Sequence, residues 1–188
     1  DNKNPLYNTY IELDSISTKF YNVSEFNLIN VTQNDTLFFR TEFKGGKNQE
    51  DKYDLNLFHT INEDKNSVVG FKKSEVFFKD NLWFINENEN FKNKVVFDKF
   101  LKNFDIEELL FSNNGESFAF KGQIKGDNYK DLQLNFNDLD LNKVTPTLNN
   151  LTFDGKINGL IDYKQDGEIY KPISDLKVAD LKINKFVL

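Results

Sequence analysis

Few residues of this sequence could perform chemistry. His59 is the sole histidine, and the chain has no cysteine. A nucleophilic site would need the imidazole beside a hydroxyl and an orienting carboxylate, commonly with a G-x-S-x-G turn, and no such turn occurs. Without cysteine, disulfides, thiol nucleophiles and cysteine-based zinc sites are excluded. We therefore expect His59 to be structural, and we expect no catalytic residue and no cofactor.

Paired carboxylates are the remaining candidates for a site. Asp138 with Asp140, and Glu107 with Glu108, offer the oxygen ligands that Ca²⁺ takes, but they lack the loop spacing and the glycine of an EF-hand. The glycines form neither a P-loop nor a G-x-G-x-x-G turn. These carboxylates are better explained as residues on the solvent-exposed faces of strands than as metal ligands, so the sequence predicts no metal site.

Composition narrows the class of protein. The 188 residues, of 22.0 kDa, suffice for one domain or for several stacked units of a longer array. The net charge is -6, and Lys and Arg alternate with acidic residues, so no basic stripe is available for a nucleic acid partner. No run approaches the roughly 20 apolar residues of a membrane-spanning helix. Because the sequence starts without Met and stops in an apolar run, we interpret it as an internal segment of a longer chain.

Period-2 alternation is the main structural signal, and it predicts half-buried strands. In residues 131–137, Leu132, Leu134 and Phe136 alternate with polar residues. The same pattern recurs at Leu37, Phe39 and Phe43, at Tyr53, Leu55 and Leu57, at Phe118 and Phe120, and at Leu151 and Phe153. Turn sequences separate these runs at 44–47, 62–66, 113–116, 126–128 and 165–167. The expected fold is all-β, an antiparallel meander over residues 1–188.

A sequence pattern that predicts a bent strand recurs along the chain. After Phe136 the apolar register slips by one, because Leu139 and Leu141 have the opposite parity. Both pairs stay on one side only if a bulge lies between them. The same spacing recurs at Leu176, Val178, Leu181 and Ile183, at Phe104, Ile106, Leu109 and Phe111, and more loosely at Ile11, Leu13, Ile16 and Thr18. Such a unit is suited to stacking into a long curled sheet.

Two places favour short helical turns. Thr145 and Pro146 supply an N-cap and a proline at the first helical position. Phe97, Phe100, Leu101 and Phe104 have i, i+3, i+4, i+7 spacing, which makes a short helix over residues 97–103 an alternative to a strand.

With so little helix, the apolar side of the sheet has two alternative fates. It closes against a second sheet or itself, or it curls into an open trough that meets an apolar ligand. The alternation leaves both open. Residues 77–86 are apolar on both sides, with Leu82 and Phe84 facing opposite to Trp83 and Ile85, so we expect this strand to be covered on both faces.

Residues 131–184 resemble the TamB family of Bacteroidetes, which belongs to the AsmA-like superfamily. The resemblance rests on an ordered phrase: Lys143-Val-Thr-Pro146, then Leu151-Thr-Phe-Asp-Gly155, then Asn158-Gly159, and Asp162-Tyr163. Residues 34–46 and 68–86 also read like the middle of such chains. The best-recognised repeat covers residues 131–188.

This resemblance implies a non-enzymatic periplasmic bridge, anchored in the inner membrane and reaching an outer-membrane barrel of the TamA type, of the Omp85 superfamily. Its strands would form a taco-like sheet whose apolar groove conducts phospholipid acyl chains and supports outer-membrane protein assembly. Other envelope proteins are further candidate partners. In that group of bacteria, Asp14-Ser15-Ile16 and Asp35-Thr36-Leu37 match a short O-glycan acceptor, which makes Ser15 and Thr36 candidate glycosylation sites.

Parity predicts which side chains line the groove. The predicted lining residues are Leu132, Leu134, Phe136, Leu139, Leu141, Leu151, Phe153, Leu176, Val178, Leu181 and Ile183, followed by Phe104, Ile106, Leu109, Phe111, Phe118 and Phe120. Two other functions remain open. One is a chaperone-like scaffold whose sheet edges bind strands of outer-membrane proteins. The other is a plain β-sandwich module of a surface protein, in which these residues fill a closed core.

Overall fold

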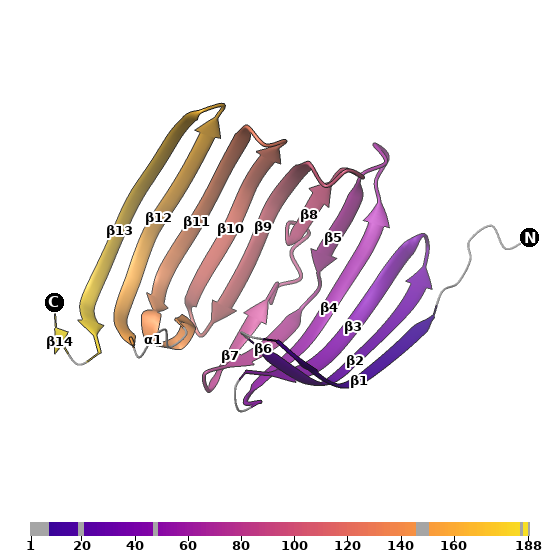
Figure 1. Cartoon of the computed structure of the whole chain (residues 1–188), viewed down its shortest axis with the longest axis horizontal. Coiled ribbons are helices and arrows are strands. Elements are labelled where there is room, and N and C mark those ends of the chain that lie inside the picture. The colour runs from indigo at the N-terminus through magenta and orange to yellow at the C-terminus, as the bar shows by residue number, and fades with distance from the viewer. Residues whose placement is uncertain (1–7, 19–20, 47–48, 146–150, 185, 188) are drawn as a thin grey trace, which may run out of the picture.

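The computed structural model describes residues 8–18, 21–46, 49–145, 151–184 and 186–187, which form one antiparallel sheet (Figure 1). Its strands are β1 (Thr9–Ser17), β2 (Asn22–Gln33), β3 (Thr36–Gly45), β4 (Asp51–Ile61), β5 (Ser67–Phe71), β6 (Ser74–Phe78), β7 (Asn81–Ile85), β8 (Lys94–Phe97), β9 (Asn103–Asn113), β10 (Glu116–Lys125), β11 (Tyr129–Asp140), β12 (Phe153–Asp166), β13 (Ile169–Ile183) and β14 (Phe186–Val187). One short helix, α1 (Leu141–Val144), follows β11. The all-β prediction is confirmed.

Neighbours in the sequence are mostly neighbours in the sheet, as the turn sequences predict. Residues 62–66 join β4 to β5, 113–116 join β9 to β10, 126–128 join β10 to β11, and 165–167 join β12 to β13. The remaining predicted turn lies between β3 and β4, although residues 47–48 are outside the described part.

The ladder divides in the middle of the sheet. The second half of β4 pairs with β5, and its first half pairs with β6. In the same way β9 pairs with β8 near its start and with β7 near its end. Between β4 and β9 the sheet therefore consists of two short strand pairs, β5–β8 above and β6–β7 below (Figure 1).

Buried polar side chains fill the seam between these two strand pairs. Ser74, Asn86 and Asn93 are 0%, 3% and 1% exposed. Asn86 Nδ2 donates to the carbonyl of Phe71 at 2.6 Å, and Asn93 Oδ1 accepts from the backbone N–H of Leu110 at 2.9 Å. These side-chain hydrogen bonds replace the ladder hydrogen bonds that are lost where the sheet divides. The replacement is needed because buried backbone N–H and C=O groups require hydrogen-bond partners.

Three of the four predicted bends, those in β9, β11 and β13, coincide with a β-bulge. The pairing of β11 with β12 shifts between Phe136 and Leu139, and that of β13 shifts opposite Asp154 to Lys156. The pairing of β9 with β10 shifts opposite Phe120 to Gly122. Asp138 and Asp180, the extra residues of two of these bulges, have φ of 48° and 53°. The sequence prediction of repeated bent strands is confirmed here.

The looser copy of this pattern falls in β1. The pairing of β1 and β2 keeps a constant register, whereas β2 shifts against β3 between Ser24 and Asn27. Glu25, with φ of 50°, is the extra residue of β2. The register of β1 with β2 continues past Glu25, so the bulge lies between β2 and β3, and no shift marks the predicted bend in β1 itself.

The bent lower ends of the strands close a small hydrophobic core, which we call the basal core. Trp83, Leu139 and Ile157 are buried at its centre. The half-buried residues packed around them are Val76, Phe78, Phe111, Phe118, Phe136, Leu141, Val144 and Leu176. The rings of Phe111 and Phe118 stack at 4.6 Å, and Trp83 lies 6.0 Å from Phe118. Because these residues come from strands β6 to β13, the sheet must be hollow on this side.

The described helix coincides with neither predicted helical turn. The helix α1 ends at Val144, before Thr145, and begins after Asp140, whose side chain accepts from the N–H of Asn142 and caps the helix. Pro146 and the residues to 150 lie outside the described part. In residues 97–103, Phe97 ends β8 and Asn103 begins β9, with a turn between them in which Leu101 has φ of 55°.

Above the basal core the sheet is a single layer. The chain exposes 12923 Å², whereas a compact protein of 22.0 kDa exposes about 9,300 Å². Among the described residues, no second sheet covers the upper part of the hollow side. The structure is thus closed at one end and open along the rest of its strands.

Candidate functional site

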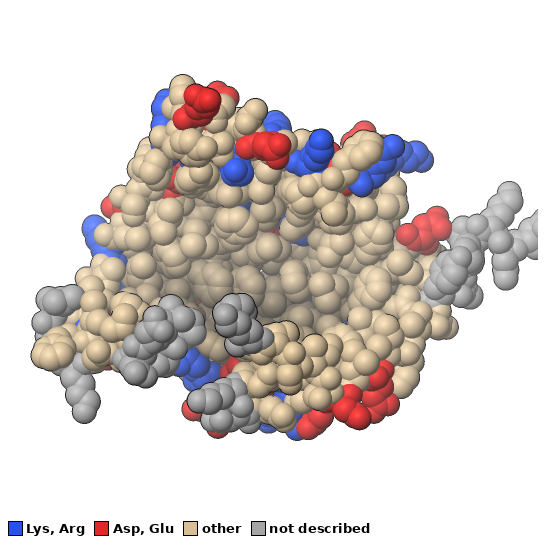
Figure 2. Space-filling view, in the orientation of Figure 1, with Lys and Arg blue, Asp and Glu red and all other residues tan. Residues whose placement is uncertain are grey.

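The hollow side of the sheet, here called the concave face, is built of rows of apolar side chains that run across the strands. The upper row is Leu37, His59, Val69, Val95, Ile106, Gly122, Leu132, Tyr163 and Pro172, each paired with the next. The row below it in the C-terminal half is Leu109, Phe120, Leu134, Ile161 and Ser174. Figure 2 shows this face as a hollow without charged side chains in its middle.

Most predicted lining residues do lie on the concave face. Those above the basal core are Ile106, Leu109, Phe120, Leu132 and Leu134, which belong to the two rows, and Phe104, which lies above them. Those in or against the basal core are Phe111, Phe118, Phe136, Leu139, Leu141 and Leu176. Those at the lower C-terminal edge are Phe153, Val178, Leu181 and Ile183. The trough and closed-core alternatives therefore each describe one part of the same face.

Two predicted lining residues are placed differently. Leu141 belongs to α1 instead of a continuing strand, because the cap at Asp140 ends β11. It still packs against the basal core. Leu151 lies before β12 and is 40% exposed, so it is outside the rows.

Charge is nearly absent from the concave face. In the described strands, Lys130 is the only Lys or Arg at a concave position. The carboxylates there, Asp51 and Glu116, lie at the lower end, where Asp51 accepts from the hydroxyl of Tyr21 and Glu116 pairs with Lys143. The open rows thus form a neutral, apolar surface.

His59 has a structural environment. It sits in the upper row, and its Nε2 is 3.3 Å from the hydroxyl of Ser67. No described carboxylate is hydrogen-bonded to the ring. The arrangement lacks the third member of a nucleophilic triad.

A hydrogen-bonded tyrosine pair stands at the lower end of β4. The hydroxyls of Tyr21 and Tyr53 are 2.8 Å apart, and that of Tyr21 also donates to Asp51 at 2.9 Å. Burial raises the pKa of Tyr21 and of Tyr53 above the ordinary tyrosine value. Both phenols therefore stay protonated. The Tyr21 ring occupies the space beside Gly45, where a Cβ would lie 2.3 Å from its hydroxyl oxygen.

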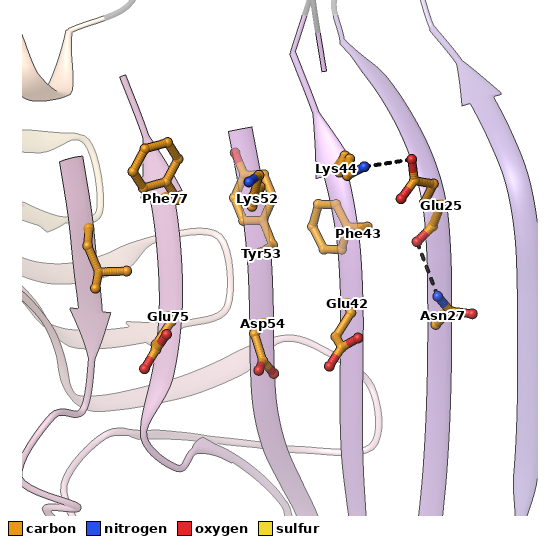
Figure 3. A pocket seen from close by; sticks show the side chains of 11 residues that line it. Glu25, Asn27, Glu42, Phe43, Lys44, Lys52, Tyr53, Asp54, Glu75 and Phe77 are labelled. Atoms are coloured by element: carbon orange, nitrogen blue, oxygen red, sulfur yellow. Dashed lines mark hydrogen bonds and ion pairs between the residues drawn. The ribbon is translucent and has the colours of Figure 1, made fainter. Parts of the chain in front are cut away.

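The opposite, outer face carries the charges. Arg40 bridges Glu42 and Asp54 there, and Lys44 pairs with Glu25. A shallow pocket of about 410 Å³ opens on this face, and Glu25, Glu42, Lys44 and Asp54 are among the residues that line it (Figure 3). Each of these exposed ion pairs contributes little to stability, and the described part holds no cluster of three or more metal ligands.

The strand predicted to be covered on both faces is covered on one. Trp83 and Ile85 are each 3% exposed on the concave side. On the outer side Leu82 is 41% exposed, and the ammonium of Lys73 lies 5.1 Å from the ring of Phe84. Within the described residues the predicted cover is present on the concave side alone, because only that side curls into a core, and cover of the outer side by a partner protein stays a prediction.

Lys130 is a functional candidate that the sequence prediction missed. Its parity matches Leu132, Leu134 and Phe136, so alternation alone places it on the concave face. An apolar pattern does not single out a lysine, although the same parity rule applies to it.

No protein-family model, curated protein or solved structure matches the chain. Within the described residues, no helix is long and apolar enough to cross a membrane.

Proposed function

We propose that the concave face binds phospholipid acyl chains and conducts them across successive strands, without enzymatic chemistry or cofactor. The observation that carries this proposal is a single-layer sheet whose open side is apolar and whose outer side is charged. A contiguous exposed apolar surface indicates an interaction site. Each CH₂ group buried there contributes about 0.8 kcal/mol.

The shape of the face sets how a lipid would lie. The basal core closes the lower end, so acyl chains would enter from the open side and point toward Trp83. Headgroups would remain in water along the upper end. The neutral rows between β9 and β13 have few polar anchors, and this favours sliding over fixed binding.

The cellular setting rests on the sequence resemblance of residues 131–184. In this proposal the chain is an internal part of a TamB-like bridge in the periplasm, anchored in the inner membrane through another part of the chain. An outer-membrane barrel of the TamA type would be contacted elsewhere in the full protein.

The edge of the sheet favours a second candidate function, a scaffold for outer-membrane protein strands. All nine residues of β1 are exposed, and within the described part its outer edge pairs with no strand. An extended peptide can add to such an edge. The test is binding of an unfolded peptide from an outer-membrane barrel. Binding that does not change with salt concentration and that is lost in Leu13→Pro would favour this function.

Leu134→Glu is expected to abolish lipid retention while the sheet stays folded. Leu134 lies between Phe120 and Ile161 in the open row, away from the basal core. A carboxylate there would have to be desolvated against an acyl chain, which is strongly unfavourable. Native mass spectrometry of gently solubilised protein would measure the bound phospholipid.

The matched control is Gln133→Glu, which adds the same charge to the neighbouring residue on the outer face. It should retain lipid like the wild type. Equal lipid retention by both variants, with both folded by circular dichroism, would contradict the proposal. So would a wild-type protein that carries no lipid at all.

A further inference from the structure

The upper end of the concave face holds one isolated positive charge. Lys130 lies at the start of β11, directly above Leu132, and pairs across the sheet with Ile124 and Gln165. In the paired strands β11 and β12, the carboxylates that flank the pair of Lys130 and Gln165, Asp131 and Asp166, occupy outer positions, where Asp131 lies 3.9 Å from Lys164. No described carboxylate forms an ion pair with Lys130.

A buried amide holds this ammonium in place. Lys130 Nζ donates to Gln165 Oε1 at 2.8 Å, and Gln165 is 5% exposed. Gln165 is itself fixed, because its Nε2 donates to the carbonyl of Gly167 at 3.1 Å and to the hydroxyl of Tyr170 at 3.3 Å. An ammonium has three donors, and the amide uses one of them. The charge is thus positioned, with donors to spare.

Two tyrosines share the upper end of the concave face with Lys130, Tyr163 on β12 and Tyr170 on β13. Tyr170 is next to Gln165 on β13, and since its oxygen accepts from the amide, its own proton remains free to donate. Tyr163 is the diagonal neighbour of Lys130 on β12, and among the described residues its hydroxyl has no hydrogen-bond partner. Diagonal neighbours on one face lie within reach of long side chains. The three donors therefore lie on three adjacent strands at the same end of the concave face.

Apolar lining runs from this end toward the basal core. The six residue steps from Lys130 to Phe136 cover roughly 20 Å of strand. One leaflet of a bilayer core is roughly 15 Å deep, half of its hydrocarbon thickness. An acyl chain of ordinary length therefore fits along β11 between Lys130 and Phe136, with a polar group at the lysine.

We propose that Lys130, with Tyr163 and Tyr170, binds the phosphate group of a phospholipid whose acyl chains lie on the concave face. This inference rests on the proposed function and adds a fixed headgroup position to it. The ammonium supplies the charge for the phosphate, the phenols supply neutral donors, and Gln165 is a positioning residue. A lipid would pause at this site between stretches of featureless lining.

The test compares two short-chain lipids with the same acyl chains, a phosphatidylglycerol and a diacylglycerol, each titrated as a monomer against the 188-residue chain. Binding is followed by the fluorescence of Trp83, the only tryptophan. We expect wild type to prefer the phospholipid roughly ten-fold, the usual scale of a hydrogen bond to a charged group. Lys130→Gln should remove this preference and leave the diacylglycerol affinity unchanged.

Lys121→Gln, on the outer face of β10, is the matched control and should keep the preference. If Lys130→Gln keeps it too, the headgroup site is wrong while acyl binding stands. If inorganic phosphate displaces the phospholipid at equal concentration, Lys130 binds free phosphate and the inference is overturned. If neither lipid binds to wild type, the proposed function itself fails, and this inference fails with it.

Discussion

Gly159→Ala is expected to destabilise the sheet by about 3 kcal/mol or more. Gly159 has φ of 121°, a conformation that side chains rarely adopt. A Cβ there would lie 2.0 Å from the carbonyl oxygen of Asp175 and 3.1 Å from Cα of Leu176. These are backbone atoms of the paired strand β13, so relief requires breaking the ladder. Urea unfolding, followed by the fluorescence of Trp83, measures the loss.

The control for this variant is Gly167→Ala. Gly167, in the β12–β13 turn, also has a positive φ, 61°, but an alanine methyl there would meet nothing within 4 Å. The expected cost is about 1 kcal/mol, that of a left-handed alanine. Equal losses for the two variants would mean that the strands are not in contact at Gly159, and the close approach would be wrong.

Asn86→Ala is the second substitution with a large expected effect, roughly 3 kcal/mol of stability, because buried hydrogen-bonding groups would lose their partners. The Asn86 amide donates to the carbonyls of Phe71 and Asn90, and its oxygen accepts from the N–H of Asn90 and from the side chain of Asn93. Alanine would leave several of these groups unpaired, at about 1–3 kcal/mol each. Urea unfolding again reports the change.

Asn135→Ala provides the comparison, because within the described part of the chain the Asn135 amide bonds only to the side chain of Gln133 on the outer face. Its expected cost is within about 0.5 kcal/mol. A small loss of stability in Asn86→Ala, together with an unchanged rate of hydrogen exchange at the Leu110 amide, would contradict this prediction. It would show that water replaces the Asn86 amide and reaches the space between the two strand pairs.

Local pattern was sufficient for much of this fold. In residues 131–137 the alternation correctly predicts which side chains share a face, because side-chain direction depends only on the strand itself. The one-residue slips at Phe136/Leu139 and Val178/Leu181 predict bulges for the same reason. Turn residues such as Asn113 to Glu116 predict the hairpins, since two or three backbone angles decide them.

The features that were missed depend on contacts between distant segments. The divided ladder requires β4 to choose two partners, and nothing in residues 51–61 signals that choice. The buried Asn86 and Asn93 lie in a stretch that looks like an ordinary polar loop. Residues 97–103 have helical spacing, but the pairing of Phe97 with Phe104 across β8 and β9 prevails over it.

The bulges of β9, β11 and β13 do not lie at one level. Strand pairing places the bulge of β9 level with Asp162 of β12, that of β11 level with Asn158, and that of β13 level with Gly155. Each bulge therefore lies several residues closer to the basal core end of β12 than the one before. When the bulges lie on a diagonal across the sheet, the bend that they produce is also diagonal. The curled sheet then twists along its length instead of forming a straight trough. In a longer sheet made of more such hairpins, the direction in which the concave face opens would rotate steadily about the axis that runs across the strands. Two lipids bound far apart on that face would then face different directions.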